Sequence, residues 1–326
     1  MAAFFVRRLL HGFIVVALVA TIVFVLIRAA PGDPFSGAMD DPSVTEAIRE
    51  AWRHAYGLDR PIFEQFVSYV RSMFHGDLGF SILLKRPVVY VLRDALPNTL
   101  VLMSIGLVSG FLLGIEVAIA QVRNLGKKTD KILGGISITF FSIPDFWLAL
   151  LIFVGLGYWL PGRIFPLGGV VDVVNYDNFG FWARAWDRIT HLILPSLTLT
   201  LLYFPLFARH QRAALIDTLP SEYMTTARAK GVSESALIRK HALRNSLLPV
   251  VTLVGVAFPA LFAGAVFVEK VFSWPGMGLR IVESIGGRDY PLLTASVIFA
   301  SAFVVAGSIL ADVVHLWLDP RLRDDR

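Results

Sequence analysis

Apolar residues of this chain gather in six long runs that are separated by polar segments. Each run is close to the roughly 20 residues that an α-helix needs to cross about 30 Å of hydrocarbon. The runs lie at about residues 9–28, 99–122, 134–160, 191–213, 247–268 and 291–317. Inside a bilayer only helices and closed barrels satisfy every backbone polar group. The pattern therefore predicts an all-α integral membrane protein with about six transmembrane helices.

Composition supports this prediction. Hydrophobic residues make up 56% of the 326 residues and charged residues only 17%, whereas about 25% of the residues of a soluble domain are charged. Arg7 and Arg8 precede 19 apolar residues, from Leu9 to Ile27. A signal peptide has an apolar region of about 7–15 residues, so we expect a first transmembrane helix that is retained. The chain has no cysteine, which excludes disulfides and thiolate metal sites.

The polar segments differ in their balance of basic and acidic residues, and this balance predicts the side of the membrane on which each lies. With the N-terminus inside, the inner segments hold 16 Lys and Arg against 7 Asp and Glu, and the outer segments hold 14 against 15. Basic residues favour the cytoplasmic side, so both termini are expected to be cytoplasmic. We expect a tail and first helix at 1–29, an outer loop at 30–98, a transmembrane core at 99–318 containing a cytoplasmic loop at 214–246, and a cytoplasmic tail at 319–326. Helix-like spacing at 44–56 and 62–73 predicts a helical outer loop.

The most informative polar segment is residues 221–249, which we call the elbow. Ser221 favours a helix start, and Glu222–Lys230 is predicted to form a short helix that ends at Gly231, where a left-handed residue belongs. Ser233 is predicted to cap a second helix, Glu234–Asn245. Small residues at Ala227 and Ala229 would let another protein approach the backbone closely. Two interpretations remain open: a loop bound to anionic lipid, or a pair of helices that dock in a groove of a partner protein.

A specific resemblance favours the second interpretation. The elbow sequence EYMTTARAKG, followed 18 residues later by Pro249, resembles the cytoplasmic loop of permeases in binding-protein-dependent ABC importers. Ten further motifs resemble the dipeptide/oligopeptide branch of that family and extend from residue 7 to residue 323. They are RRLL (7–10), APGDP (30–34), YGLDRP (56–61), GDLG (76–79), RP (86–87), LPNT (96–99), HALRNSLLPVVT (241–252), VEKVFSWPGMG (268–278), RDYP (288–291) and LDPRLR (318–323).

The resemblance implies the fold of a type I ABC importer permease, with an outer helical loop and cytoplasmic coupling helices. It implies as partners a second homologous permease, two ABC ATPase subunits and an extracytoplasmic substrate-binding protein. The residues expected to couple the chain to the ATPase are Glu222, Ala227, Ala229, Gly231, Ile238, Leu248 and Pro249. Those expected to form an outer gate are Glu269, Pro275, Gly276 and Gly278, with Glu269 holding the region by a salt bridge. Nickel chelates, glutathione and oligosaccharides are alternative substrates within the branch.

The sequence departs from the family pattern at two positions. Tyr223 follows Glu222 where the family usually has alanine, and Asp145 stands where a small or apolar residue is expected. The second departure leaves the exact substrate open.

No nucleotide-binding motif occurs in this chain. GxxxxGK[ST] is absent, because Gln121 stands where the first glycine of a motif around Gly126-Lys127-Lys128 would be. We therefore expect a transport subunit that is not an enzyme and binds no cofactor, with ATP and Mg²⁺ used by partner subunits. The histidines lack metal-ligand spacing, so no metal site is expected.

Three acidic residues fall inside the predicted spans: Glu116, Asp145 and Asp312. Ionised groups in a membrane are costly and should face protein or water. For Glu116 and Asp312, which lie towards the inner ends of their spans, snorkelling or pairing with Arg123 or Arg321 is a sufficient structural explanation, and a place in the translocation path is the alternative. Asp145 follows Pro144 and fits a structural role or the translocation path equally well. A proton-coupled secondary transporter that uses Asp145 and Asp312 is a rival interpretation, and a membrane-bound sensor or scaffold is a third.

Gly106, Gly110 and Gly114 recur at every fourth residue of the second span. Such a stripe of small residues lets two helix backbones approach closely in lipid. We expect it to be a packing surface between helices and not a ligand site.

Overall fold

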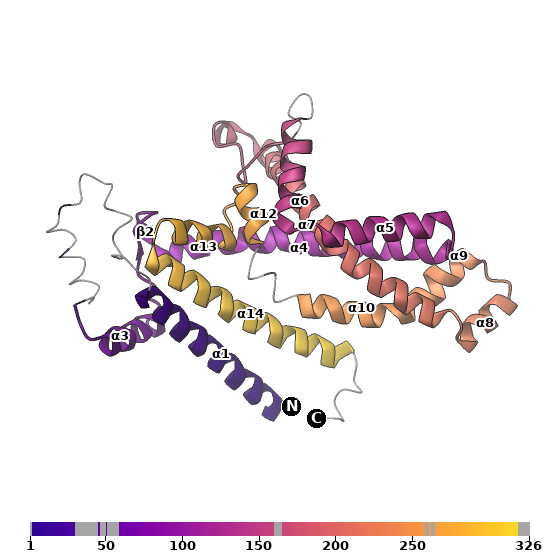
Figure 1. Cartoon of the computed structure of the whole chain (residues 1–326), viewed down its shortest axis with the longest axis horizontal. Helices are drawn as coiled ribbons and strands as arrows, with labels where there is room; N and C mark the ends of the chain where they lie inside the picture. Colours follow the sequence, from indigo (N-terminus) through magenta and orange to yellow (C-terminus); the bar gives the residue numbers. More distant parts are fainter. Residues whose placement is uncertain are drawn as a thin grey trace. The chain divides into compact units, whose positions relative to one another are not determined.

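The computed structural model describes residues 2–29, 45, 50, 59–159, 165–257, 261 and 265–318 (Figure 1). The described part is mostly helical. Four helices are long and apolar enough to cross a membrane: Val6–Ala29, Val88–Arg123, Phe181–Thr218 and Tyr290–Asp312. A fifth candidate is a bent pair, Lys128–Ser142 with Asp145–Tyr158. The apolar run at 247–268 is helical to Ala257 and again from Val266, and residues 258–260 and 262–264 lie outside the described residues.

The bend in the fifth candidate has a local cause. α5 (Lys128–Ser142) ends where Ile143 becomes extended, with φ −76° and ψ 127°. A proline disfavours helix in the residue before it, and Pro144 supplies that restriction before α6 (Asp145–Ile152) begins. The two segments differ in direction by 106°. The predicted continuous span at 134–160 is therefore broken, and η2 (Phe153–Tyr158), a π-helix, follows α6.

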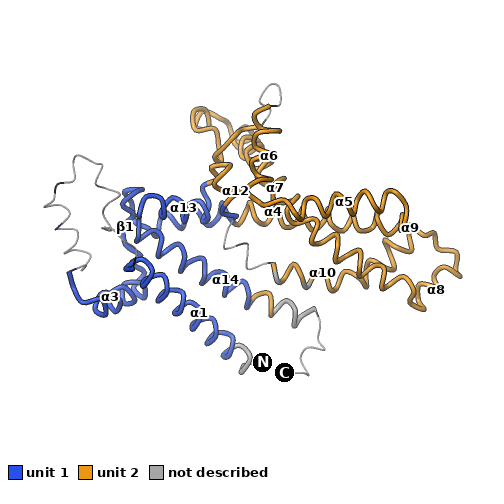
Figure 2. The backbone as a smooth tube through the Cα atoms, in the orientation of Figure 1, with its two compact units in different colours: residues 1–99, 262–266, 275–309 blue, residues 100–261, 267–274, 310–326 orange. Residues whose placement is uncertain are grey.

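The chain divides into two compact units, which Figure 2 colours separately. The first comprises residues 1–99, 262–266 and 275–309. It contains α1 (Ala2–Ala29), α3 (Ile62–Phe74), α13 (Met277–Gly286) and the first part of α14 (Tyr290–Leu318). The predicted helix at 62–73 is confirmed by α3, whereas the predicted helix at 44–56 lies outside the described residues except at positions 45 and 50.

Packing within the first unit joins segments far apart in sequence. Phe24 of α1 contacts Phe66 and Tyr69 of α3. The start of α4 (Val88–Arg123) packs against α13 and α14 through an apolar cluster. A two-residue hairpin, β1 (Phe80–Ser81) with β2 (Arg86–Pro87), which an all-α prediction does not include, lies beside it. Buried Asp289 holds the hairpin, since it accepts hydrogen bonds from Ser81 Oγ (2.5 Å) and Leu83 N (3.0 Å).

The second unit comprises residues 100–261, 267–274 and 310–326. The rest of α4 packs against α7 (Phe181–Thr218) along the glycine stripe. An added Cβ at Gly110 would lie 2.8 Å from Tyr203 Cβ, and at Gly114 it would lie 2.6 Å from Phe207 Cβ. At Gly106 it would overlap Leu199. The three glycines thus meet three residues of α7 spaced four apart, which confirms the predicted packing surface.

Candidate functional site

The elbow consists of two helical segments joined by a glycine turn. α8 (Glu222–Ala229) ends at Gly231, whose φ of +77° is left-handed. Gly231 N donates to Arg228 O (2.9 Å) and Val232 N to Ala227 O (3.3 Å), so the turn satisfies the carbonyls at the end of α8. Ser233 Oγ then accepts a hydrogen bond from Ala236 N, at 3.4 Å. The predicted turn and cap are confirmed.

The second helix of the elbow is longer than predicted. α9 (Glu234–Ala236), η4 (Leu237–Ala242) and α10 (Leu243–Ala257) follow one another without a gap. Pro249 lies inside α10, so the predicted end at Asn245 is wrong. Proline within a helix is tolerated in membrane proteins, because neighbouring groups satisfy the backbone that it frees.

An apolar cluster fixes the elbow to the spans. Met224 and Leu237 are fully buried, and Ala227, Ile238 and Ala242 are buried with them. They pack against one face of α4 and against Leu215 of α7. The residues that α4 contributes are Ile115, Ala118, Ile119 and Val122. The elbow is therefore part of the packed structure of the second unit.

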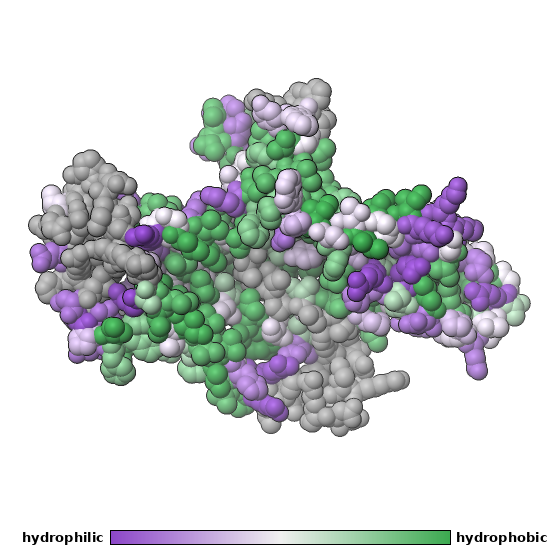
Figure 3. Space-filling view, viewed as in Figure 1, coloured by the Kyte–Doolittle hydropathy of each residue, from purple (hydrophilic) through white to green (hydrophobic). Residues whose placement is uncertain are grey.

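Burial divides the seven predicted coupling residues into two groups. Ala227 and Ile238 belong to the apolar cluster. We expected Ala227 to let a partner approach, but its side chain faces the core of this chain, because the buried stripe of α8 runs through Met224 and Ala227. The other five, Glu222, Ala229, Gly231, Leu248 and Pro249, are exposed. Figure 3 shows hydrophilic side chains gathered over the α8 and α9 end of the second unit.

Glu116 has a partner that sequence reasoning missed. Its carboxylate pairs with Arg239 of η4 and not with Arg123: Arg239 Nη1 donates to Oε1 (2.9 Å) and Nη2 to Oε2 (2.5 Å). The two residues are 123 positions apart, and no local pattern in the sequence signals the pairing.

The other two intramembrane acids differ from Glu116 in their surroundings. Asp145 is exposed in the first turn of α6, where the helix dipole favours a carboxylate. Asp312 is half-buried in α14, and its suggested partner Arg321 lies outside the described residues. A path role for Asp145, Glu116 or Asp312 stays a prediction.

Two cavities open in the second unit near the elbow. One, of about 350 Å³, lies between α5 and α7; Lys131, Arg209 and the Asp130–Arg212 ion pair line its polar part. The second, of about 410 Å³, lies between α7 and α10, and His210, Asp217, Asn245 and Pro249 are among its lining residues. Pro249 has no N–H, so the carbonyl of Asn245 lacks its usual partner within the helix.

Asn98 and Thr99, where the predicted second span begins, contact the segment predicted to form the outer gate. Asn98 Nδ2 donates to the carbonyl of Pro275 (3.1 Å), and Met277 N donates to Thr99 Oγ1 (2.7 Å). Gly276 is the N-cap of α13, and Gly278 is buried in its first turn. Sequence reasoning missed Asn98 and Thr99 as contacts of this turn, although the LPNT motif marked them.

Glu269 lies on α12 (Val266–Val271) in the second unit and is fully buried. Its carbonyl accepts a hydrogen bond from Trp274 N, at 2.8 Å. The salt bridge and the gate role predicted for Glu269 stay predictions.

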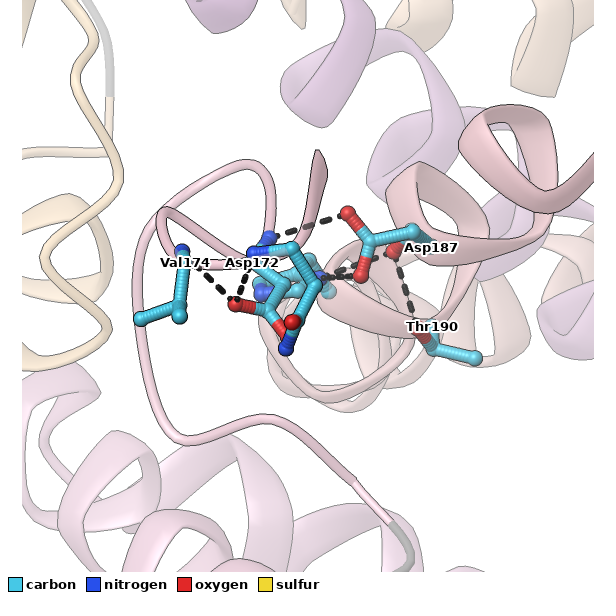
Figure 4. Close-up of polar contacts among 6 residues, drawn as sticks. Asp172, Val174, Asp187 and Thr190 are labelled. Atoms are coloured by element: carbon cyan, nitrogen blue, oxygen red, sulfur yellow. Dashed lines mark hydrogen bonds and ion pairs between the residues drawn. The ribbon is translucent and has the colours of Figure 1, made fainter. Parts of the chain in front are cut away.

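A polar cluster ahead of α7 was not anticipated (Figure 4). Asp172 accepts hydrogen bonds from Asn175 Nδ2 (2.9 Å) and Val174 N (2.9 Å), while Asp187 accepts from Asp172 N (2.9 Å). The side-chain hydrogen bond from Asn175, followed by those from the backbone N–H groups, lowers the pKa of Asp172 below its ordinary value. The cluster orders the loop that leads into α7.

Comparisons with known proteins bear on the family to which this chain belongs. Residues 106–324 match the family described as binding-protein-dependent transport system inner membrane component, and residues 1–103 match the N-terminal part of such components. The matches confirm the resemblance that the sequence motifs indicated.

Curated relatives match over nearly the whole length of this chain. It is 36% identical to the oligopeptide transport system permease protein AppB of Bacillus subtilis, with 99% of each chain covered. It is 33% identical to the dipeptide transport system permease protein DppB of Lactococcus lactis, covering 99% of this chain and 100% of the relative. It is 34% identical to the glutathione transport system permease protein GsiC of Escherichia coli, with 99% of each covered.

One solved structure has a similar fold. It is a chain of the MetNI methionine ABC transporter in an inward-facing conformation, with a TM-score of 0.55 and 16% identity. The match covers 71% of this chain and 97% of that one. At this identity the likeness concerns the fold alone.

Proposed function

Because this chain belongs to the family of binding-protein-dependent transport system inner membrane components, we propose that it is the permease subunit of an ATP-driven importer for dipeptides or oligopeptides. Its substrate is delivered by an extracytoplasmic binding protein. A second homologous permease completes the path, and two ABC ATPase subunits hydrolyse ATP with Mg²⁺ on the cytoplasmic side. Both termini of this chain face the cytoplasm, and the chain itself catalyses no reaction.

The observation that carries this proposal is the outer surface of the elbow. Ala229 and Gly231 are exposed, and no atom lies within 4 Å of a Cβ added at Gly231. A small, open surface on a rigid base suits helix-in-groove docking. The apolar cluster beneath it joins the elbow to α4 and α7. An ATPase that binds the elbow would thus move these helices.

The substrate class rests on the relatives. Those compared above are named for oligopeptides, dipeptides and glutathione, and all three kinds of compound contain peptide bonds. Uptake of a labelled dipeptide into proteoliposomes with the complete importer tests this directly. We expect vanadate to stop the uptake and unlabelled oligopeptides to compete more strongly than glutathione. Stronger competition by glutathione would assign the chain to glutathione transport instead.

The Gly231→Glu variant tests docking of the ATPase. A bulky charged side chain would then occupy the small surface, so co-purification of the ATPase should fall and transport should stop. Gly126→Glu is the matched control: its φ of +75° equals that of Gly231 within 2°, and no atom lies within 4 Å of its added Cβ either. Equal ATPase retention in the two variants would refute docking at the elbow.

A further inference from the structure

The pair of Glu116 and Arg239 joins a transmembrane helix to the elbow. Glu116 lies in α4, and Arg239 lies in η4. Two parallel N–H···O bonds, of 2.9 and 2.5 Å, connect the guanidinium to the carboxylate. A bidentate pair of this kind fixes the relative orientation of its partners as well as their distance.

The pair lies at the margin of the apolar cluster beneath the elbow. Ile115, the neighbour of Glu116, and Ile238, the neighbour of Arg239, are both buried in that cluster. The two charged side chains themselves are about half exposed, 55% for Glu116 and 49% for Arg239. The cluster and the pair therefore connect the same two elements, one through apolar contact and the other through directed hydrogen bonds.

The apolar cluster and the ion pair constrain the position of η4 on α4 in different ways. Apolar contact is non-directional and depends on the area buried, so the cluster keeps η4 against α4 but does not by itself select one orientation of η4. The bidentate pair has one geometry. We propose that Glu116 and Arg239 are positioning residues that hold the elbow in one orientation on α4 and thereby transmit the movement of the elbow to the transmembrane helices.

The proposal rests on the proposed function, in which an ATPase moves the elbow. It changes the prediction for Glu116, for which sequence reasoning offered a structural role or a place in the translocation path. Exposed ion pairs contribute little to stability. Loss of this pair should therefore leave the protein folded and bound to its ATPase while it alters transmission.

A distance measurement tests the orientation in the assembled importer. The chain has no native cysteine, so spin labels attach only at Leu125→Cys, just beyond α4, and Arg244→Cys in α10; both native residues are exposed. Pulsed EPR should give a narrow distance distribution in the otherwise native chain and a broad one in Glu116→Gln. Because the pair is exposed, about 1 M salt, with a Debye length near 3 Å, should broaden the native distribution as well. An unchanged width in Glu116→Gln would overturn the proposal.

The amount of substrate transported per ATP hydrolysed tests whether the pair transmits the movement of the elbow to the transmembrane helices. Glu116→Gln and Arg239→Gln should each lower this ratio by about two- to fivefold, the range that the interaction energy of an exposed pair allows. The double variant should be no worse than either single one, and Glu116→Arg combined with Arg239→Glu should restore most of the ratio. Lys240→Gln removes the same charge from the same turn and should leave the ratio unchanged.

The outcomes separate this proposal from the proposed function. A broadened distance distribution with an unchanged transport ratio would overturn transmission through the pair. Equal losses of the transport ratio in Arg239→Gln and Lys240→Gln would overturn it too. The loss would then come from removing any positive charge in this turn, and not from breaking the pair. If the ATPase does not dock at the elbow, the Gly231→Glu variant will co-purify with the ATPase as well as the native chain does. That result does not depend on whether the Glu116–Arg239 pair is intact.

Discussion

Replacement of Gly114 by alanine tests whether the close approach of α4 and α7 holds the second unit together. A Cβ at this position would lie 2.6 Å from Phe207 Cβ and 2.9 Å from both Phe204 O and Ala208 N. Ordinary contacts of a Cβ lie at 3.4–4 Å. Two of the three obstructing atoms are backbone, which a change of rotamer cannot move. The helices must therefore separate by several tenths of an ångström.

The expected cost follows from two opposing effects. Overpacking of a well-packed site costs about 1–3 kcal/mol. Alanine in place of glycine within a helix gains about 0.5–1 kcal/mol. The free energy of unfolding should therefore fall by up to about 2.5 kcal/mol in Gly114→Ala, instead of rising by about 0.5–1 kcal/mol.

Gly135→Ala is the matched control. Gly135 lies inside α5, and no atom lies within 4 Å of its added Cβ, so only the gain of helix propensity applies. Unfolding of the purified chain in mixed micelles, titrated with SDS and followed by circular dichroism, gives both free energies. Equal or greater stability of Gly114→Ala relative to Gly135→Ala would refute the argument from close packing.

Two further contacts, which lie outside the packing surface between α4 and α7, give predictions. Thr99→Val removes the acceptor for Met277 N and should cost about 1–3 kcal/mol of unfolding free energy, since a buried donor is left unsatisfied. Thr139→Val removes an exposed hydroxyl that donates to Gly135 O of its own helix and should cost less; equal losses by SDS titration would contradict this. Asp172→Asn should speed hydrogen exchange at Val174 N and Asn175 N at pH 7, whereas Asp177→Asn should not. The folded pKa of Asp172 is lowered below 3.8, so its contribution is present above that pH and is lost as the pH falls through the folded value. A difference between the native chain and Asp172→Asn that persists when the carboxyl of Asp172 is protonated would refute this origin.

Most of the helices and the turn of the elbow follow from local sequence signals. Gly231 and Ser233 mark the turn and the cap because their chemistry acts within a few residues. Pro144 likewise marks a break in the third apolar run, but the angle of 106° depends on what α5 and α6 pack against. Pro249 is a weaker signal of a helix end than Pro144 is. There the helix continues, from Leu243 to Ala257.

The partners of the site residues did not follow from the sequence. Arg239 lies 123 positions from Glu116, and Asn98 lies 177 positions from Pro275, so neither contact leaves a periodic pattern. The inward position of Ala227 was missed for a related reason. An alanine fits a buried face and a partner-binding face equally well, and only the packing of Met224 and Leu237 against α4 decides between them.

α4 is the element on which the features of the second unit converge. Its glycines admit α7, its buried residues from Ile115 to Val122 support the elbow, and Glu116 pairs with Arg239. A solvent-exposed loop would absorb a displacement through its own backbone dihedrals, since little holds it in one conformation. The elbow cannot do so without exposing Met224 and Leu237, each of which is fully buried and would cost about 1.5–3 kcal/mol to expose. A partner that moves the elbow must therefore move α4 and α7 with it, which is the property that the proposed function requires.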